Sequence, residues 1–278
     1  MKQPLVRPPF AWLALVGLIW LVATACATAS DPPSPWATWG TLRLKARSTL
    51  FSGRVEMRVT RAEGKCTLAT TTIARFFGAK IAHAETLSVI DETTGRSERY
   101  ENVSKKRARR YIFGQHGYRV AKLDPEGDPD RPIDEWHVRS EVEYAYPTAE
   151  DGRPVLIHDY YGMLLHLRNL DLHAPGDEAV VHVATSKGPA AFRVVVGEVG
   201  HSDQTVIDPR DGSERTLAAD ELRLRIIPAD PDRDTEGFLK MEGETELWVE
   251  ADSKTLLRLS GKVPRVPGRV RLVLSELG

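Results

Sequence analysis

The chain has 278 residues, with 38 lysine and arginine residues against 39 aspartate and glutamate residues, and 41% of the residues are hydrophobic. This length is enough to enclose a substantial core, and the near-neutral charge argues against a nucleic-acid-binding protein, which is usually clearly basic. The two cysteines exclude a scaffold of several disulfides and a four-cysteine zinc site.

Residues 1–25 have the pattern of a signal peptide. Lys2 and Arg7 precede an apolar stretch at residues 10–23, which is shorter than the about 20 residues of a membrane-spanning helix. The small residues before Cys26 resemble the lipobox of bacterial lipoproteins, in which the cysteine is lipidated after cleavage. We therefore predict a protein of the cell envelope, anchored to a membrane through lipidated Cys26. By resemblance to lipoprotein sorting signals, Ala27 favours the outer membrane, with the protein facing the periplasm.

Two other interpretations of this segment are open. Ala23-x-Ala25 and Ala27-x-Ala29 also suit ordinary signal cleavage, which would release a soluble periplasmic or secreted protein, and the segment could stay uncleaved as an anchor. Residues 26–40 are predicted to form a tether, because three prolines at residues 31–36 prevent a helix or a central strand.

From residue 41 onward, apolar and polar residues alternate with period two, as in strands with one buried and one solvated face. The segments with this alternation are 42–47, 55–59, 136–144, 222–226 and 270–274. Such strands form antiparallel sheets, because parallel sheets are covered on both faces. We predict one antiparallel β domain over residues 41–278, either undivided or in two halves that meet near the proline-containing polar segment 124–134.

Turn signals separate these strands at short intervals, which suits hairpins rather than βαβ units. They are Glu63-Gly64, Thr94-Gly95, His116-Gly117, Lys187-Gly188, Asp211-Gly212 and Gly261.

One segment, 159–172, breaks the alternation. Tyr160, Tyr161, Leu164 and Leu165 recur at helical spacing, Asp159 can cap the N-terminus, and Pro175-Gly176 ends whatever follows. We expect this to be the one substantial helix, which would lie across a sheet face or plug an open end.

No catalytic motif is present: a Gly-x-Ser-x-Gly elbow, a His-Glu-x-x-His pair and a phosphate-binding glycine loop are all missing from the sequence. We therefore predict neither an enzyme nor a cofactor. Cys66 lies in a strand-like run and is expected in the core, because a reactive thiol needs a partner that lowers its pKa. A Cys26–Cys66 disulfide is an alternative only if Cys26 is not lipidated.

Histidines cluster around the predicted helix. His158 and His166 are eight residues apart, so their rings could not share a metal on one straight helix. We therefore predict surface or capping histidines, including His173 and His182, and no metal.

Two kinds of charged segment are open to more than one interpretation. The acidic segments 124–130, 208–212 and 230–237 favour hairpin turns; the third begins like a calcium loop, but Thr235 and Met241 occupy its glycine and bidentate-glutamate positions. The basic run 105–110 is typical of a solvated strand edge, with contact to anionic lipid as the alternative.

The C-terminal half resembles a family of bacterial exported proteins, the domain of unknown function 3108. The resemblance covers residues 159–277. It rests on the Asp-led helix ending in Leu167-Arg168, the step from Leu172 to Gly176, Glu246-Leu-Trp-Val-Glu-Ala-Asp252, and the closing segments Arg258-Leu-Ser-Gly-Lys and 267–274. It implies a mostly β protein: a curved antiparallel sheet or half-barrel wrapped around one main helix at about 159–172. By analogy to envelope lipoprotein carriers it also implies a hydrophobic cavity, which fold alone does not establish.

The sequence favours a non-enzymatic envelope lipoprotein that binds an apolar ligand such as lipid, or that assists envelope assembly. Tyr160, Tyr161, Leu164 and Leu165 are the candidates to line the cavity. A structural or protein-interaction module with a filled core is the second hypothesis. An envelope hydrolase, which would need converging serine, histidine and aspartate side chains, is the third.

Overall fold

The computed structural model describes residues 39–278, except 48–50, 105, 231–236, 265 and 267. The described residues belong to one compact unit, Pro35–Gly278. The predicted signal peptide, Cys26 and residues 26–38 of the predicted tether lie outside the described residues, as does most of the third acidic segment. Within the described part of the chain, no helix is both long and apolar enough to cross a membrane.

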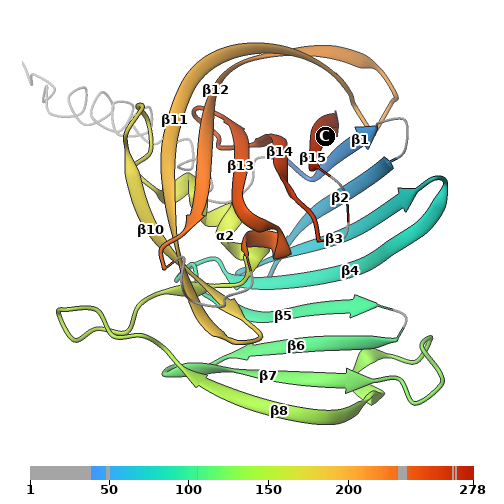
Figure 1. The fold of residues 1–278 in the computed structure, drawn as a ribbon, viewed down its shortest axis with the longest axis vertical. Helices are drawn as coiled ribbons and strands as arrows, with labels where there is room; N and C mark the ends of the chain where they lie inside the picture. The colour runs from blue at the N-terminus through green and yellow to red at the C-terminus, as the bar shows by residue number, and fades with distance from the viewer. Residues whose placement is uncertain (1–38, 48–50, 105, 231–236, 265, 267) are drawn as a thin grey trace, which may run out of the picture. The chain divides into compact units, whose positions relative to one another are not determined.

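Strands dominate the unit, as the period-two pattern predicts (Figure 1). They are β1 Thr41–Arg47, β2 Phe51–Ala62, β3 Lys65–Phe76, β4 Ala79–Asp91, β5 Ser97–Ser104, β6 Arg107–Phe113, β7 Gly117–Asp124, β8 His137–Ala145, β9 Ile157–His158, β10 Glu178–Thr185, β11 Gly188–Ile207, β12 Glu214–Pro228, β13 Glu242–Glu250, β14 Leu256–Lys262 and β15 Arg269–Leu277.

The helical elements are α2 at Tyr160–His166 and three short 3-10 helices, at Ile133–Glu135, Leu167–Asn169 and Phe238–Lys240. The predicted helix at 159–172 is thus confirmed, with a shorter α-helical part that continues as a 3-10 turn.

All the strands belong to one sheet, with the order β8-β7-β6-β5-β4-β3-β2-β1-β15-β14-β13-β12-β11-β10-β9. Neighbouring strands are antiparallel, except that the two-residue β9 runs parallel to β10. The first strand pairs with the last, because Leu42 lies opposite Leu277. The predicted class is therefore right: a mostly β protein with a large curved antiparallel sheet and one main helix.

The sheet curls back on itself in two places. The long strand β11 pairs with β10 and β12 and also reaches β15, where Ile207 lies opposite Glu276. At the other place the closure is made by side chains, because the Tyr118 hydroxyl donates to the Thr185 carbonyl at 3.1 Å and the Tyr144 hydroxyl donates to that of Ser186 at 3.0 Å. These tyrosines of β7 and β8 thereby reach the β10–β11 hairpin.

Alternation places the core on the concave face. Leu42 and Leu44 in β1 are buried, whereas Arg43 and Lys45, which alternate with them, face outward and bind the carboxylate of Glu276. The largest core cluster is mainly aliphatic and takes residues from β1 to β4, from α2 and from β10 to β15. A second cluster, which we call the tyrosine cluster, contains Tyr100, Tyr111, Tyr118, Val120, Ile157 and Ala184.

The predicted burial of one face of residues 136–144 is wrong. Strand β8 is the edge of the sheet, and Val138 and Val142 are 49% and 47% exposed. Trp136 precedes the strand and packs in a small third cluster against Leu123 and neighbouring residues. The apolar alternation is present in the sequence, but no element packs over this strand closely enough to bury it.

The predicted turn at Gly261 is also wrong, because Gly261 lies inside β14, opposite Val270. A Cβ atom at this position would overlap the thioether of Met241, so glycine here leaves room for a neighbouring side chain rather than for a bend. The turns at Gly64, Gly95 and Gly212 have positive φ angles and are confirmed.

Candidate functional site

The carboxylate of Asp159 joins helix α2 to two strands. One oxygen accepts hydrogen bonds from the backbone N–H groups of Tyr161 at 2.9 Å and Gly162 at 3.0 Å, so Asp159 caps the helix as predicted. The other oxygen accepts from the hydroxyls of Ser88 in β4 at 2.7 Å and Ser97 in β5 at 2.8 Å. Burial raises the pKa of this fully buried carboxyl, and the four donors oppose that rise.

Gly162 lets the helix approach these strands closely. A Cβ atom on Gly162 would lie 2.9 Å from both the Asp159 carboxylate and the Ser97 hydroxyl. A side chain at this position would therefore push α2 away from β5 and stretch the hydrogen bonds that hold it.

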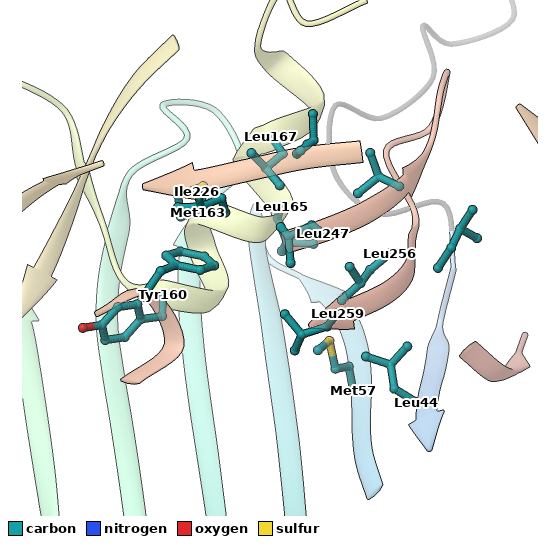
Figure 2. Close-up of a cluster of buried hydrophobic side chains, with 14 of the residues drawn as sticks. Leu44, Met57, Tyr160, Met163, Leu165, Leu167, Ile226, Leu247, Leu256 and Leu259 are labelled. Atoms are coloured by element: carbon teal, nitrogen blue, oxygen red, sulfur yellow. The ribbon is translucent and has the colours of Figure 1, made fainter. Parts of the chain in front are cut away.

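The four residues predicted to line a cavity lie on or beside the core. Tyr160 and Leu165 are buried in the largest cluster, together with Met163 and Leu167, and Tyr161 and Leu164 pack against it. Figure 2 shows Leu165 and Leu167 directed toward Leu247 and Leu256 of the neighbouring strands. The helix thus fills the concave side of the sheet with its own side chains.

A small cavity remains next to the helix. It holds about 30 Å³ and is lined by Leu164, Leu165 and Leu167, with Lys254 and Arg168 among the other lining residues; Tyr160 and Tyr161 do not line it. Ligand pockets usually enclose about 300–1,000 Å³. This space is too small for an acyl chain in the conformation described.

A second cavity, which sequence reasoning missed, holds about 160 Å³. It lies between the β4–β5 and β6–β7 turns and the segment before β9, and it is lined by Arg96, Phe113, Tyr146 and Ile157 among others. These residues are far apart in the chain and share no motif, so only the fold brings them together.

The interpretation of His158 as a surface or capping residue is wrong. His158 precedes the helix, in β9, and its ring stacks on that of His166 with 4.3 Å between centroids. It is 2% exposed, and among the described residues neither ring nitrogen has a hydrogen-bond partner. Burial, with a smaller contribution from His166, lowers the pKa of His158 to about 3, and burial also lowers that of His166.

The described polar groups around Asp159 and His158 do not form a recognisable reactive centre. Among the described residues there is no cluster of three or more histidine, cysteine, aspartate or glutamate side chains that could hold a metal ion. The hydroxyls of Ser88 and Ser97 both donate to Asp159, so neither is activated by the neighbouring His158. The arrangement fixes a helix in place.

Cys66 is buried in the core, as predicted. Burial raises the pKa of its thiol, which disfavours the reactive thiolate.

The basic run is not at a strand edge, because β6 lies between β5 and β7 in the sheet. Arg110 donates to Glu101 at 2.6 Å and to Asp134 at 2.5 Å, and Ala108 between the cations is buried. Ala108 and Arg110 lie on the same face of β6, where the charge of Arg110 is neutralised, so burial in this strand does not follow the simple alternation of the other strands.

Comparisons with known proteins bear on the fold alone. No protein-family model matches the chain, and no curated protein matches it either. A solved structure, the beta-barrel-like protein of domain of unknown function DUF1849 from Brucella abortus, aligns with a TM-score of 0.51 at 10% sequence identity, over 85% of this chain and 95% of that one. The chain thus has the fold of a β-barrel-like protein, and the resemblance to the domain of unknown function 3108 remains a prediction.

Proposed function

We propose that the protein is a non-enzymatic module of the bacterial cell envelope that works through its outer surface, in protein interaction or envelope assembly, rather than as a carrier of apolar ligands. The observation that carries this proposal is the filled concave face. A carrier needs an unfilled apolar cavity, and here the side chains of α2 occupy the corresponding space and leave about 30 Å³ beside Leu164 and Leu165.

The hydrogen bonds that hold helix α2 in place also argue against a carrier. A lid that opens to admit a ligand is expected to be held weakly, since moving elements come from the least stable parts of a fold. Helix α2 is instead held by a buried carboxylate with four hydrogen bonds, from Ser88, Ser97, Tyr161 and Gly162. Opening it would expose this carboxylate and the apolar side chains of the helix together.

The test is mass spectrometry under native conditions on protein purified from bacterial envelopes without detergent. We expect the mass of the polypeptide with any covalent modification and no additional bound lipid. In a parallel experiment, cross-linking in intact cells should recover a specific envelope protein. Copurification of a lipid in stoichiometric amount, released when α2 is displaced, would replace this proposal with that of a carrier.

Anchoring through Cys26 is a separate part of the proposal. It rests on the basic, apolar and small-residue pattern of residues 1–29. Metabolic labelling with a fatty acid should mark the wild-type protein and leave the Cys26→Ser variant unlabelled, while both are found in the envelope fraction. Equal labelling of the two, or recovery of the wild type in the cytoplasm, would contradict the anchor.

A further inference from the structure

The cavity of about 160 Å³ lies where three loops meet at one end of the sheet. The β4–β5 turn and the β6–β7 turn lie at this end, and the chain leaves β8 there, since Ala145 is opposite Gly117 at the start of β7 (Figure 1). The segment after β8 turns back on itself, because the N–H of Val155 donates to the Pro147 carbonyl at 2.9 Å. It thereby brings residues 154–157 against the two turns.

Hydrogen bonds fix both turns that frame this cavity. In the β4–β5 turn, the Asp91 carboxylate accepts from the Thr94 N–H at 2.7 Å and from the Thr94 hydroxyl at 2.8 Å. At the β6–β7 turn, the Tyr146 hydroxyl donates to the Gly114 carbonyl at 3.0 Å, and the Tyr146 N–H donates to the His116 carbonyl at 2.9 Å. The cavity is thus preformed, so a ligand would not have to order these loops on binding.

Aromatic and aliphatic side chains provide the apolar part of the lining. Phe113 and Tyr146 line the cavity and also pack against the tyrosine cluster, which holds their rings in place. Ile157 is 3% exposed and marks the closed end of the cavity, whereas Leu156 is 37% exposed and marks the opening. A cavity of roughly 150 Å³ can bind benzene. The site therefore has room for one aromatic ring with a small substituent.

One cation in the lining is available to a ligand. The two carboxylates of the lining are engaged, because Asp91 accepts two hydrogen bonds from its own turn and Glu98 binds Lys65 Nζ at 2.6 Å. Arg96 also lines the cavity, and within the described part of the chain its exposed guanidinium takes part in no ion pair or side-chain hydrogen bond. Burial raises the pKa of Tyr146, and the charge of Arg96 opposes this rise, so the guanidinium acts on the aromatic wall of the cavity.

We propose that this cavity is a binding site for a small aromatic carboxylate. The ring of the ligand packs against Phe113, Tyr146 and Ile157, and its carboxylate binds the Arg96 guanidinium. A planar guanidinium matches a carboxylate, because two parallel N–H groups can donate to its two oxygens. The described lining includes no residue of α2, so binding needs no movement of the helix and is independent of the filled concave face.

Calorimetric titration of the full chain with phenylacetate tests this proposal. The chain carries Cys26→Ser, so that no acyl chain attached there can compete for the cavity. Phenylacetamide is neutral and phenethylamine is cationic, and both are matched probes because they keep the ring and replace the carboxylate. In a chain with labelled isoleucine methyl groups, the NMR signal of Ile157 reports the cavity, and that of Ile226 in the aliphatic core is the reference.

We expect phenylacetate to bind saturably and to shift the Ile157 signal, while the Ile226 signal stays unchanged. Phenylacetamide should bind about tenfold more weakly, and phenethylamine more weakly still, because neither can accept charge-assisted hydrogen bonds from the guanidinium. High salt should weaken the binding of phenylacetate, since Arg96 is exposed.

Three variants separate the role of the charge from a structural role. Arg96→Gln should weaken phenylacetate binding about tenfold and leave phenylacetamide binding unchanged, a selective effect that a loss of folding would not produce. Arg58→Gln, at a side chain that is 67% exposed on β2, should change neither. Leu156→Glu adds a carboxylate at the opening, where it competes with the ligand for Arg96, and should abolish phenylacetate binding while the Tm stays that of the parent.

Equal affinity for phenylacetate and phenylacetamide would overturn the proposal, because the cavity would then recognise the ring alone. Tighter binding of phenethylamine would also overturn it and would assign the cavity to cations, through Asp91 and Glu98. The same holds if a folded Arg96→Gln variant binds phenylacetate as well as the parent does, or if the parent shows no saturable binding up to about 10 mM.

Discussion

The aliphatic core around α2 and the tyrosine cluster bury their side chains by different means. The first contains residues such as Met163 and Leu247 that are fully buried and have no polar atoms to satisfy. The second is built from stacked and tilted tyrosine rings, and its hydroxyls reach backbone carbonyls of the β10–β11 hairpin. The stability of the first region therefore depends on how completely apolar side chains fill its interior, and that of the second depends also on directed hydrogen bonds.

The two regions also end differently at the edges of the sheet. The aliphatic region is closed by strand pairing, since β11 reaches β15 and β1 pairs with β15. The tyrosine region ends at the exposed strand β8. There, side-chain hydrogen bonds from Tyr118 in β7 and Tyr144 in β8 to the β10–β11 hairpin take the place of backbone pairing between strands. We expect substitutions in the first region to cost more stability, and the following experiments test this from the largest effect to the smallest.

The largest loss is expected for Met163→Ala. Met163 is fully buried on α2, so truncation removes apolar contacts and leaves a cavity that the pinned helix cannot close. Urea unfolding of the full chain should show a loss of about 3–4 kcal/mol. Leu164→Ala, at a partly buried position on the same helix, is the matched control and should cost less than half as much. Equal costs would mean that the helix is loosely packed.

A loss of about 3 kcal/mol is expected for Asp159→Ala, because it removes the helix cap and leaves the Ser88 and Ser97 hydroxyls buried without their acceptor. Asp177 provides a control, because it also accepts two backbone hydrogen bonds, from His173 and Ala174, but at an exposed position. Asp177→Ala should cost about 1 kcal/mol. If both variants lose the same amount, burial of the Asp159 carboxylate adds nothing to its role as a cap.

The third effect is a dependence of stability on pH. The pKa of His158 is about 3 in the folded protein and about 6.5 when unfolded, so between these values the unfolded state binds the extra proton. Stability from this group is complete above pH 6.5 and falls with acidification, by about 2 kcal/mol on reaching pH 5. His158→Phe should reduce this slope while keeping a ring against His166. The slope that remains would come from His166 and His182, whose pKa values burial also lowers. An unchanged slope would show that His158 is protonated or solvated in the folded state.

The smallest effect is expected in the tyrosine cluster. Tyr118→Phe keeps the ring and removes the hydroxyl that donates to the Thr185 carbonyl, which should cost about 1 kcal/mol in thermal or urea unfolding. Tyr146→Phe removes a similar hydrogen bond, to Gly114, at an exposed position and should cost under about 0.5 kcal/mol. A loss for Tyr118→Phe that matched Met163→Ala would remove the distinction between the two regions.

Local patterns predicted the parts of the fold that local forces determine. The alternation at Leu42 and Leu44 is enough to predict a half-buried strand, and Asp159 before Tyr160 and Tyr161 is enough to predict a capped helix. The same reasoning failed at β8, because burial of Val138 and Val142 depends on whether another element covers them. It failed at Gly261 because the reason for the glycine is Met241, which is distant in the sequence.

The site depends still more on distant residues. The partners of Asp159 lie 62 and 71 residues earlier in the chain, and no spacing rule connects an aspartate to two serines at such separations. The stacking of His158 on His166 was missed because both were placed on one helix, whereas the chain bends at Asp159 and brings the rings together.

The continuity of β11 has a consequence for how the sheet comes apart. This one strand runs from the hairpin that receives the tyrosines of β7 and β8 to the residue that meets β15. Local opening at either end strains the same backbone, so the two regions are mechanically coupled although their cores are separate. Their slowly exchanging amide protons should therefore be lost together, in a single cooperative step, rather than region by region.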